Sequence, residues 1–562
     1  MATLPEHAPL PHAEPPWLRP AILLVATLLV FTWFSGDVTD NDAWWHLKTG
    51  EYIWQNRTLP TPDPFAQTTY MGKPLYRGEK LVRDFNLTHE WLAQVIMYWI
   101  FAAAGLPGLI LARQLVLTAL CAIVGLVAWR RSGGFYRALG AALAAAAVAQ
   151  FVARDRPYLV TFLFVGVTIA LLEYRRWLWL LPPILLFWAN CHSGFFLGWV
   201  VMGAYCAEAL YLRRRGQPVK GERRLFLATA ISILISGINP DGFRVFEVLL
   251  LYRNSPMQKM IFEWYRPKFW EVSAFTVVLY AAAAVLFLAR RRVRIADWLL
   301  FGLFAAAALS AVRNIILVGI IGPILIASYL PWKRAVTTAV QFLALALLTA
   351  GLGWQLSHGA MRYRSAWNLP SGAADFLLQH RASGRLFNTY DTGGYLIWRL
   401  WPQLKVFVDG RALNESVYAD SQRIAYNAEA DATGPSAEEL LRKYGIDVIA
   451  MPMLDSLGSV YLLPAALADP SQKEWKLVYQ DAQAVVYMRT PPAGVQPVNS
   501  LDAFTSMEAQ CRMMIENSGF AGCALAVSDV FAKIGDSSRA THWRRIRRQH
   551  SDLPDSPMHI SK

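Results

Sequence analysis

The chain has 562 residues, of which 55% are hydrophobic and only 17% are charged, below the roughly 25% that is typical of soluble domains. Apolar runs of about 15 to 22 residues recur from Ala21 to Gly351, which excludes a soluble protein and indicates a polytopic membrane protein. The net charge of +14 would suit a nucleic-acid-binding protein, but membrane topology explains its distribution better, so nucleic acid is not expected as a partner.

The first apolar run, residues 20–36, lacks a small-residue cleavage site and is interpreted as a retained helix rather than a signal peptide. Directly after it comes a stretch with Asp40 and Asp42, followed by two tryptophans and His46. Carboxylates at the edge of a membrane are costly unless they bind a cation, pair with a base or carry chemistry. This stretch therefore predicts a membrane enzyme rather than a passive anchor.

A long first outer loop, residues 37–106, is expected to contain amphipathic surface helices, one of them starting at His89. Eleven spans are predicted in a transmembrane domain of residues 1–356, some short enough to imply tilt or local thinning of the bilayer. They lie near residues 20–36, 107–129, 138–153, 157–173, 177–190, 194–212, 224–238, 271–289, 296–312, 314–331 and 335–356.

The basic residues decide the orientation of these spans. If the segment from His89 lies on the surface, 17 basic residues fall in the loops of one side, Lys333 and Arg334 among them, against 8 in the short loops of the other. The positive-inside rule then places the N-terminus in the cytoplasm and the C-terminus outside. We therefore expect a multi-pass protein of the bacterial inner membrane, in contact with the lipid bilayer, with a periplasmic C-terminal domain.

With this topology, polar residues collect at the outer ends of the helices, where they predict a polar cavity that opens outward. Ordinary ion pairing at helix ends is the alternative for any single one of them. The set comprises Asp40, Asp42, His46, Glu90, Arg113, Arg154, Asp155, Arg156, Asn190, His192, Asn239, Asp241, Glu263, Trp264, Arg313 and Asn314.

After Gly351 the sequence becomes mixed in character. Residues 357–498 predict an α/β domain on the outer face, and residues 499–562 a helical extension with a basic tail at 544–548. Strands are expected at residues 385–390, 405–409, 446–451 and 475–479, and a helix at 437–444. Cys511 and Cys523 either pair in an oxidising compartment or stay free, and the sequence leaves both open.

An outward cavity suits a lipid-borne substrate. Transfer of a sugar from a polyprenyl phosphate needs a carboxylate to act as base or to organise a divalent cation, and arginines to neutralise the departing phosphate. Asp40 or Asp42 suits the first role, with Asp40 the first choice. The donor-phosphate candidates are Arg154, Arg156, Arg313 and Arg113. The supporting candidates are His46, Glu90, Asp155, His192 and Asn190. A Mg²⁺ or Mn²⁺ ion held by Asp40, Asp42 and His46 is a further hypothesis.

This layout resembles the GT-C superfamily of integral-membrane glycosyltransferases, which includes protein O-mannosyltransferases, aminoarabinose transferases and the oligosaccharyltransferase catalytic subunit. Thr39–Asp42 stands where those enzymes have an acidic motif just after the first helix. Gly72–Tyr76 is similar to a Pro-Leu region of the mannosyltransferase first loop, and Arg113 to an arginine at the start of the second span. The resemblance implies an inverting transferase of a bacterial branch, with a polyprenyl-phosphate-sugar donor and a cell-envelope lipid, glycan or protein as acceptor.

A weaker similarity lies in the outer domain. The stretch from Thr389 to Tyr395, with Asp391 in it, looks like the acceptor-binding motif of oligosaccharyltransferases, but the two tryptophans of that motif are absent. A tight turn between strands, in which glycine supplies positive φ, is the favoured interpretation. Asp409 and Arg411 are read either as a turn at a strand end or as acceptor contacts. Two other functions remain open, a transporter or flippase of lipid-linked glycans and a catalytically inactive scaffold of envelope assembly.

Overall fold

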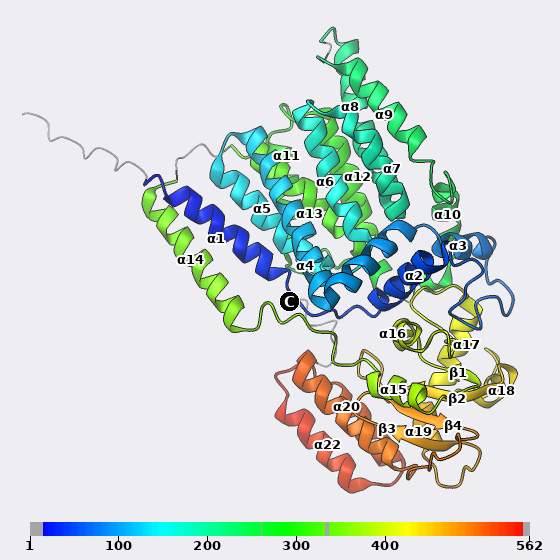
Figure 1. The fold of residues 1–562 in the computed structure, drawn as a ribbon. Coiled ribbons are helices and arrows are strands. Elements are labelled where there is room, and N and C mark those ends of the chain that lie inside the picture. The colour runs from blue at the N-terminus through cyan, green and yellow to red at the C-terminus, as the bar shows by residue number, and fades with distance from the viewer. Residues whose placement is uncertain (1–14, 218, 260, 332–335, 555–562) are drawn as a thin grey trace, which may run out of the picture.

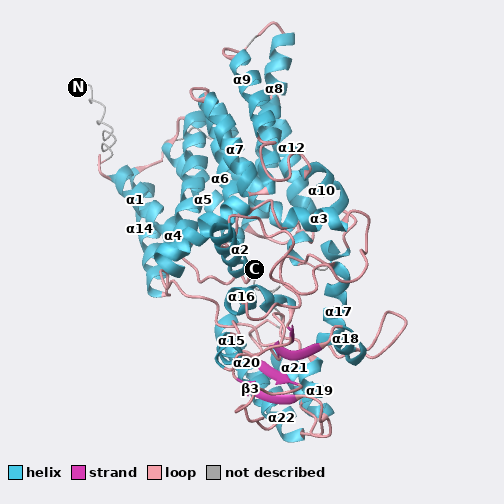
Figure 2. Cartoon of the chain, turned by 45° about the vertical axis from the view of Figure 1, so that its right-hand side comes forward, coloured by secondary structure: helices cyan, strands magenta, loops and turns pink. Residues whose placement is uncertain are grey.

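A computed structural model of the protein describes residues 15–217, 219–259, 261–331 and 336–554. A large helical bundle forms its upper part in Figure 1, and a smaller C-terminal α/β part lies below the bundle. The first loop lies between the two, with the helices α2 (Asp42–Asn56) and α3 (Glu79–Asn86). The strands of the described residues are confined to the lower part (Figure 2).

A helix occupies each of the eleven ranges predicted to span the membrane. Among the described residues, five helical stretches are long and apolar enough to cross a membrane by length and composition, and five shorter apolar helices have 10–17 residues. The eleven helices are α1 (Leu18–Trp33), α4 (Trp91–Ser132), α5 (Phe135–Ala149), α6 (Tyr158–Tyr174), α7 (Leu181–Cys191), α8 (Phe196–Arg214), α9 (Glu222–Ile235), α11 (Ala274–Leu288), α12 (Ile295–Ser310), α13 (Ile315–Tyr329) and α14 (Thr338–Ser357). The predicted cytoplasmic residues Lys333 and Arg334 lie outside the described residues.

The helix α13 forms the centre of the bundle. It is apolar on all sides and almost entirely buried, as expected of a helix that other helices surround. In contrast, α14 buries only Gln341 and pairs with α1 at the edge of the bundle, where the two run side by side (Figure 1). The exposed leucines of α14, such as Leu347, suit contact with lipid rather than with water.

The surface segment from His89 and the span after it are parts of one interrupted helix. Within α4, Gly105 has φ 58° and ψ −152°, a backbone conformation that is open mainly to glycine and that breaks the helix there. The first part of α4 packs against α2 so closely that a side chain on Gly50 would lie 2.0 Å from the carbonyl oxygen of Gln94. The predicted division between a surface helix and a span therefore falls at Gly105.

The C-terminal part is built on a four-stranded sheet of order β1-β2-β4-β3. The strands are β1 (Arg385–Phe387), β2 (Ile446–Met451), β3 (Lys476–Gln480) and β4 (Val485–Met488). β1 pairs parallel with β2, and β4 runs antiparallel to both β2 and β3. Its helices are α15 (Ser371–Gln379), α16 (Tyr390–Leu400), α17 (Glu415–Ala425), α18 (Ala437–Lys443), α19 (Leu462–Leu467), α20 (Asp502–Ser518), α21 (Cys523–Lys533) and α22 (Ser537–Gln549).

Three of the four predicted strands are present, but the strand expected at residues 405–409 is wrong. Val406 makes only an isolated bridge to Ala66 of the first loop, because this segment packs on the loop instead of joining the sheet. The short strand β4 was not expected. The predicted helix at 437–444 is α18. The domain boundaries at residues 356 and 498 stay predictions.

The C-terminal helices answer two points that the sequence left open. Cys511 of α20 and Cys523 of α21 form a disulfide, with their Cα atoms 5.7 Å apart. The two residues lie on different helices, so the spacing along one helix does not keep them apart. The basic stretch expected as a tail lies on α22, which is anchored by the fully buried Trp543.

Candidate active site

Asp40 and Asp42 share one guanidinium group, that of Arg156. Arg156 lies in the loop before α6; its Nε donates to Asp40 Oδ2, and its Nη2 donates to Asp40 Oδ1 at 2.9 Å. The same Nη2 lies 2.9 Å from Asp42 Oδ2, and Nη1 lies 3.4 Å from Glu263 Oε1. Three carboxylates from the first loop and from the segment before α11 therefore meet at one arginine. We call Asp40, Asp42, Arg156 and Glu263 the acidic centre.

The two aspartates of this centre have opposite pKa shifts. Burial would raise the pKa of Asp40, but the bidentate contact with Arg156 outweighs burial and holds that pKa below its usual value. Burial raises the pKa of Asp42 to about 6; Arg156 opposes this shift and the charge of Asp40 adds to it. Asp42 is therefore the carboxylate suited to accept a proton near neutral pH, whereas Asp40 stays ionised.

Arg154 and Arg313 lie close to the acidic centre and are less constrained than Arg156. Arg154 is exposed, and its Nη1 lies 3.7 Å from Glu263 Oε1. Arg313 holds its guanidinium carbon 4.6 Å from the centre of the Trp264 ring. The two short helices that carry Glu263 and Arg313, η5 (Phe262–Trp264) and η6 (Val312–Asn314), are joined by a hydrogen bond from the Val312 amide to the Tyr265 carbonyl at 2.9 Å.

Arg113, in contrast, is fully engaged by protein groups. Its guanidinium donates to the carbonyl oxygens of Phe34 and Gly36 at the end of α1, and it pairs with Asp155. Arg113 and Asp155 are both buried. This pair therefore connects the start of the first loop to α4 and to the loop before α6. Asn190 is engaged as well, because its Oδ1 accepts from Trp91 Nε1 at 2.9 Å.

Glu90 is surrounded by three histidines. The closest nitrogens of His89, His192 and His46 lie 3.4, 3.6 and 3.6 Å from its carboxylate oxygens. Burial would raise the pKa of Glu90, but the nearby histidines, His89 first, hold it well below its usual value. Burial lowers the pKa of His46 to about 4 and that of His192 to about 3. For His89 the attraction of Glu90 outweighs burial and raises the pKa, so His89 is the histidine of the three that is most readily protonated beside Glu90.

His46 connects the Glu90 cluster to the acidic centre. It lies four residues after Asp42 on α2, which places both side chains on one face of that helix. Its ring packs against Trp45 with 3.6 Å between the ring centres, and Gln94 Nε2 lies 3.3 Å from its Nδ1. The neutral His46 is thus oriented toward Glu90.

The candidate metal ligands do not form a metal site in this arrangement. Asp40 and Asp42 both direct carboxylate oxygens at Arg156, and the Nδ1 atom of His46 faces Glu90 and Gln94. Among the described residues, no group of three or more His, Cys, Asp and Glu side chains is placed to hold a metal ion. One guanidinium, that of Arg156, contacts both carboxylates.

The C-terminal part lies against one side of the acidic centre, while the side chains of Asp42, Arg156 and Glu263 remain 17, 19 and 23% exposed. Asp40 is only 6% exposed. A side chain on Gly410 would lie 1.9 Å from Asp42 Oδ1, and one on Gly394 would lie 2.3 Å from the carbonyl oxygen of Asn41. Because these two glycines have no side chains, the C-terminal part can lie directly against Asn41 and Asp42.

The predicted turn at Asp391 is wrong, because Asp391 to Tyr395 form the first turns of α16. The glycines of this stretch serve close packing rather than positive φ. The backbone carbonyl of Asp391 accepts from Asn41 Nδ2 at 2.6 Å, and burial raises the pKa of the Asp391 carboxyl to about 6. Tyr395 is buried with its ring edge-on to Trp44, 5.2 Å between the ring centres. Both residues therefore connect α16 to the start of α2, through Asn41 and Trp44.

Asp409 and Arg411 fasten the C-terminal part to the first loop. Arg411 Nε donates to Asp409 Oδ1 at 2.7 Å, and its Nη1 donates to Asp63 Oδ1 at 2.8 Å. All three side chains are almost fully buried. Gly410 and Arg411 form the predicted turn, which a hydrogen bond from the Ala412 amide to the Asp409 carbonyl closes at 3.1 Å, although no strand of the sheet precedes it. Contact with an acceptor stays a prediction. The three residues form a buried ion triad between two segments nearly 350 residues apart.

We predict that Arg411→Met lowers the free energy of unfolding by about 3 kcal/mol, because it leaves Asp63 and Asp409 buried side by side without a counter-charge. The matched control is Arg442→Met on α18, where the arginine pairs with Glu438 on the surface; its loss should cost under about 1 kcal/mol. Denaturant unfolding in mixed micelles measures both. Equal stability of the two variants would contradict the structural role of the triad.

Several residues that form the candidate site were given no role in the prediction from sequence. Glu263 stands out only as one outer polar group, His89 only as the start of a surface helix, and Asp63 not at all. The His89-Glu90 pair in the sequence is a local signal of an ion pair. No local signal joins Asp63 to Arg411, or Glu263 to Arg156, because these contacts exist only after folding.

No protein-family model and no curated protein matches the chain. The structure is similar to that of the Archaeoglobus fulgidus oligosaccharyltransferase in the apo form, with a TM-score of 0.55 and 11% identity, over 90% of this chain and 79% of that chain. ArnT from Cupriavidus metallidurans bound to undecaprenyl phosphate matches with a TM-score of 0.49 and 14% identity, over 86% of this chain and 99% of that chain. The first likeness shows that the chain has the fold of an oligosaccharyltransferase, one of the enzymes whose layout the sequence resembles.

Proposed function

We propose that the protein is a membrane glycosyltransferase that transfers a sugar from a polyprenyl-phosphate-linked donor to a lipid, glycan or protein acceptor of the cell envelope. The observation that carries this proposal is the position of Asp42, a half-buried carboxyl just after α1 whose Oδ2 lies 2.9 Å from Nη2 of the same Arg156 that pairs with Asp40. Burial raises its pKa to about 6, which suits a base. The fold is one that an oligosaccharyltransferase uses. Among the two aspartates, the proposal now favours Asp42 as the base.

In the proposed reaction, an acceptor hydroxyl attacks the anomeric carbon of the donor sugar. A new C–O bond forms while the bond between the anomeric carbon and the phosphate oxygen breaks, and its electron pair leaves with the polyprenyl phosphate. Asp42 takes the proton of the attacking hydroxyl. Because the displacement occurs in one step, the configuration at the anomeric carbon is inverted.

The other residues of the acidic centre position this base. Asp40 and Arg156 form a fixed ion pair that holds Asp42 in place and sets its pKa. Arg154 and Arg313 bind the phosphate of the donor, since Arg113 and Arg156 are already engaged in buried pairs. No step is assigned to a metal ion, because Asp40 and Asp42 both pair with Arg156.

We place the protein in the bacterial inner membrane with eleven spans, the N-terminus in the cytoplasm and the C-terminal part in the periplasm. The excess of basic residues at the opposite helix ends supports this orientation. The disulfide between Cys511 and Cys523 supports an oxidising compartment for the C-terminal part. Labelling of a cysteine placed at residue 216, between α8 and α9, should fail from the periplasm, and success would reverse the orientation.

The test of function is release of polyprenyl phosphate from a panel of lipid-linked sugars by the purified full-length protein. We expect release with at least one donor, and unchanged release when a chelator is added. A transporter would move the intact lipid-linked sugar without releasing polyprenyl phosphate, and a scaffold would do neither. Loss of release on chelation, restored by Mg²⁺ or Mn²⁺, would contradict the assignment of Arg156.

We predict that Arg154→Gln and Arg313→Gln each raise the KM for the donor about tenfold or more, because each removes a charged hydrogen bond to the phosphate. The expected effect on stability is small, since Arg154 is exposed and its pair with Glu263 is partly solvated. Initial rates over a range of donor concentrations measure KM and kcat separately. A fall in kcat with unchanged KM in both variants would contradict their role in donor binding.

A further inference from the structure

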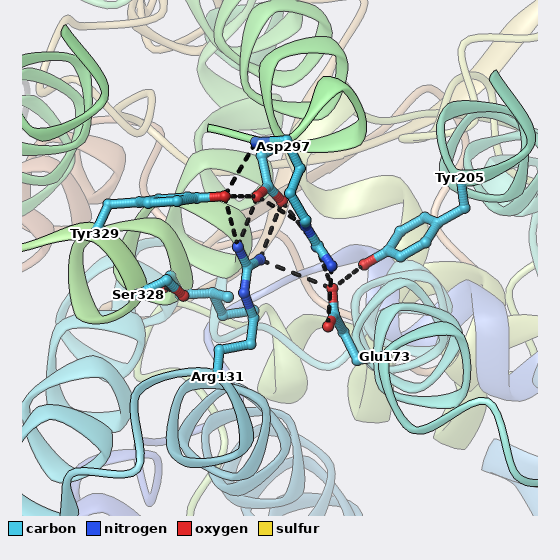
Figure 3. A network of polar contacts seen from close by, with 8 residues as sticks. Arg131, Glu173, Tyr205, Asp297, Ser328 and Tyr329 are labelled. Atoms are coloured by element: carbon cyan, nitrogen blue, oxygen red, sulfur yellow. Dashed lines mark hydrogen bonds and ion pairs between the residues drawn. The ribbon is translucent and has the colours of Figure 1, made fainter. Parts of the chain in front are cut away.

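A second polar network joins residues of α4, α6, α8, α12 and α13, as Figure 3 shows. Arg131 donates to both carboxylate oxygens of Asp297, at 3.0 and 2.6 Å, and Arg294 bridges Asp297 and Glu173. Tyr205 OH donates to Glu173 Oε1 at 2.6 Å. The carboxylates of Asp297 and Glu173 are buried. The network is thus a closed set of ion pairs that fixes the two arginines in position.

The position of this network along the helices separates it from the acidic centre. Arg131 lies in the last turn of α4 and Glu173 near the end of α6, whereas Arg156 precedes the start of α6. The 17 residues of α6 span about 25 Å. The second network therefore takes no part in the chemistry proposed for Asp42.

A cavity of about 400 Å³ opens beside the network and is lined mainly by basic side chains. Its charged lining consists of Arg130, Arg131, Arg292 and Arg294 against the single carboxylate of Glu173, with Asp297 directly behind Arg131. Arg130 and Arg292 are exposed at this cavity, and within the described part of the chain neither is paired with a carboxylate. The cavity therefore has an excess of positive charge that only an external anion can balance.

Exposed aromatic residues surround the same helix ends. Trp129 and Tyr174 stand next to Arg130 and Glu173 in the sequence, and Trp177 and Trp298 lie on the neighbouring segments. Exposed tryptophan and tyrosine at the ends of membrane helices are typical of the depth of the lipid headgroups. This depth indicates that the anion reaching the cavity comes from the membrane rather than from free solution.

We propose that this cavity binds the phosphate group of an anionic phospholipid. Arginine guanidinium groups match the phosphate oxygens with paired hydrogen bonds, and basic pockets between membrane helices are suited to anionic headgroups. Arg131 and Arg294 are held in place by the buried carboxylates, and Arg130 and Arg292 supply the unbalanced charge. The lipid would join the ends of α4, α6, α12 and α13 without entering the candidate active site.

The test compares retention of phosphatidylglycerol and phosphatidylcholine by the full-length protein in mixed micelles, measured by native mass spectrometry. The variant Arg130→Gln/Arg292→Gln changes only exposed side chains and should fold normally. We expect preferential retention of phosphatidylglycerol by the native protein and a loss of about 30-fold in the variant, since each basic residue near the headgroups contributes roughly a factor of five. The matched control is Arg214→Gln/Arg215→Gln, two exposed arginines at the end of α8, which should retain the lipid.

Equal retention of the two lipids, or full retention by Arg130→Gln/Arg292→Gln, would overturn the proposal. Equal losses in the control variant would overturn it too, because they would show a diffuse surface charge instead of a site. Inorganic phosphate forms a separate arm: displacement of phosphatidylglycerol by millimolar phosphate would assign the cavity to a soluble anion. Because the readout is lipid binding, it is independent of whether the protein transfers a sugar.

Discussion

Replacement of Asp42 by asparagine is expected to lower turnover by about 10²- to 10⁴-fold, the range for loss of a general base. The amide keeps the size of the side chain but does not accept the proton of the attacking hydroxyl. Asp37→Asn is the matched control, because Asp37 lies in the same loop and outside the acidic centre. Release of polyprenyl phosphate under saturating donor measures the effect. Full activity of Asp42→Asn would remove Asp42 from the mechanism.

The pH dependence of the native protein gives a second test of the same base. Since the pKa of Asp42 is raised to about 6 and its ionised form is the active one, kcat/KM should rise as the pH increases through about 6 and then level off. Removal of the Asp40 charge by Asp40→Asn should move this rise to lower pH, because Asp40 is one of the groups that raises the pKa of Asp42. A rise that stays in place in Asp40→Asn would show that another group titrates.

Replacement of Arg156 by glutamine is expected to destabilise the protein by about 3 kcal/mol, because it leaves the buried Asp40 beside the half-buried Asp42 and Glu263 without their shared counter-charge. The same change removes the group that lowers the pKa of Asp42, so the rise of activity should move to a pH above about 6. Denaturant unfolding in mixed micelles and a pH profile measure the two effects independently.

Two further variants separate the possible roles of Arg156. Arg156→Lys keeps the positive charge but not the planar fork, so we expect a stability between that of the native protein and that of the glutamine variant. Arg154→Gln removes a neighbouring arginine that is exposed and should leave stability almost unchanged. If Arg156→Gln were as stable as Arg154→Gln, the acidic centre would not depend on its arginine.

The helices of the bundle and the place of the acidic loop were predictable from local sequence. Apolar runs long enough to leave water form helices wherever they occur, since each run satisfies its own backbone hydrogen bonds. The surface segment was separated from the following span by the count of basic residues in the loops, and the structure places the break at Gly105. The position of Asp40 and Asp42 directly after the first apolar segment was likewise visible from that one segment of the sequence.

The partners of these residues were less predictable. Sequence reasoning placed Arg113 and Arg156 with Arg154 and Arg313 as phosphate ligands, because all four are arginines near outer helix ends. The structure divides them: Arg113 and Arg156 are engaged with buried carboxylates, and Arg154 is exposed. Which carboxylate an arginine meets depends on how distant segments pack, and no local pattern encodes that packing.

By itself, the sequence determined that this is a membrane protein with many helices and with a pair of carboxylates just after the first of them. Hydrophobic periodicity and loop charge are properties of single segments, so each can be recognised from one segment without knowledge of the rest of the fold. Only the tertiary structure decided that Asp42 rather than Asp40 has the raised pKa, that α16 contacts Asn41, and that Arg411 joins the C-terminal part to Asp63. Burial and ion pairing arise between residues up to about 350 positions apart, and they exist only once the chain has folded.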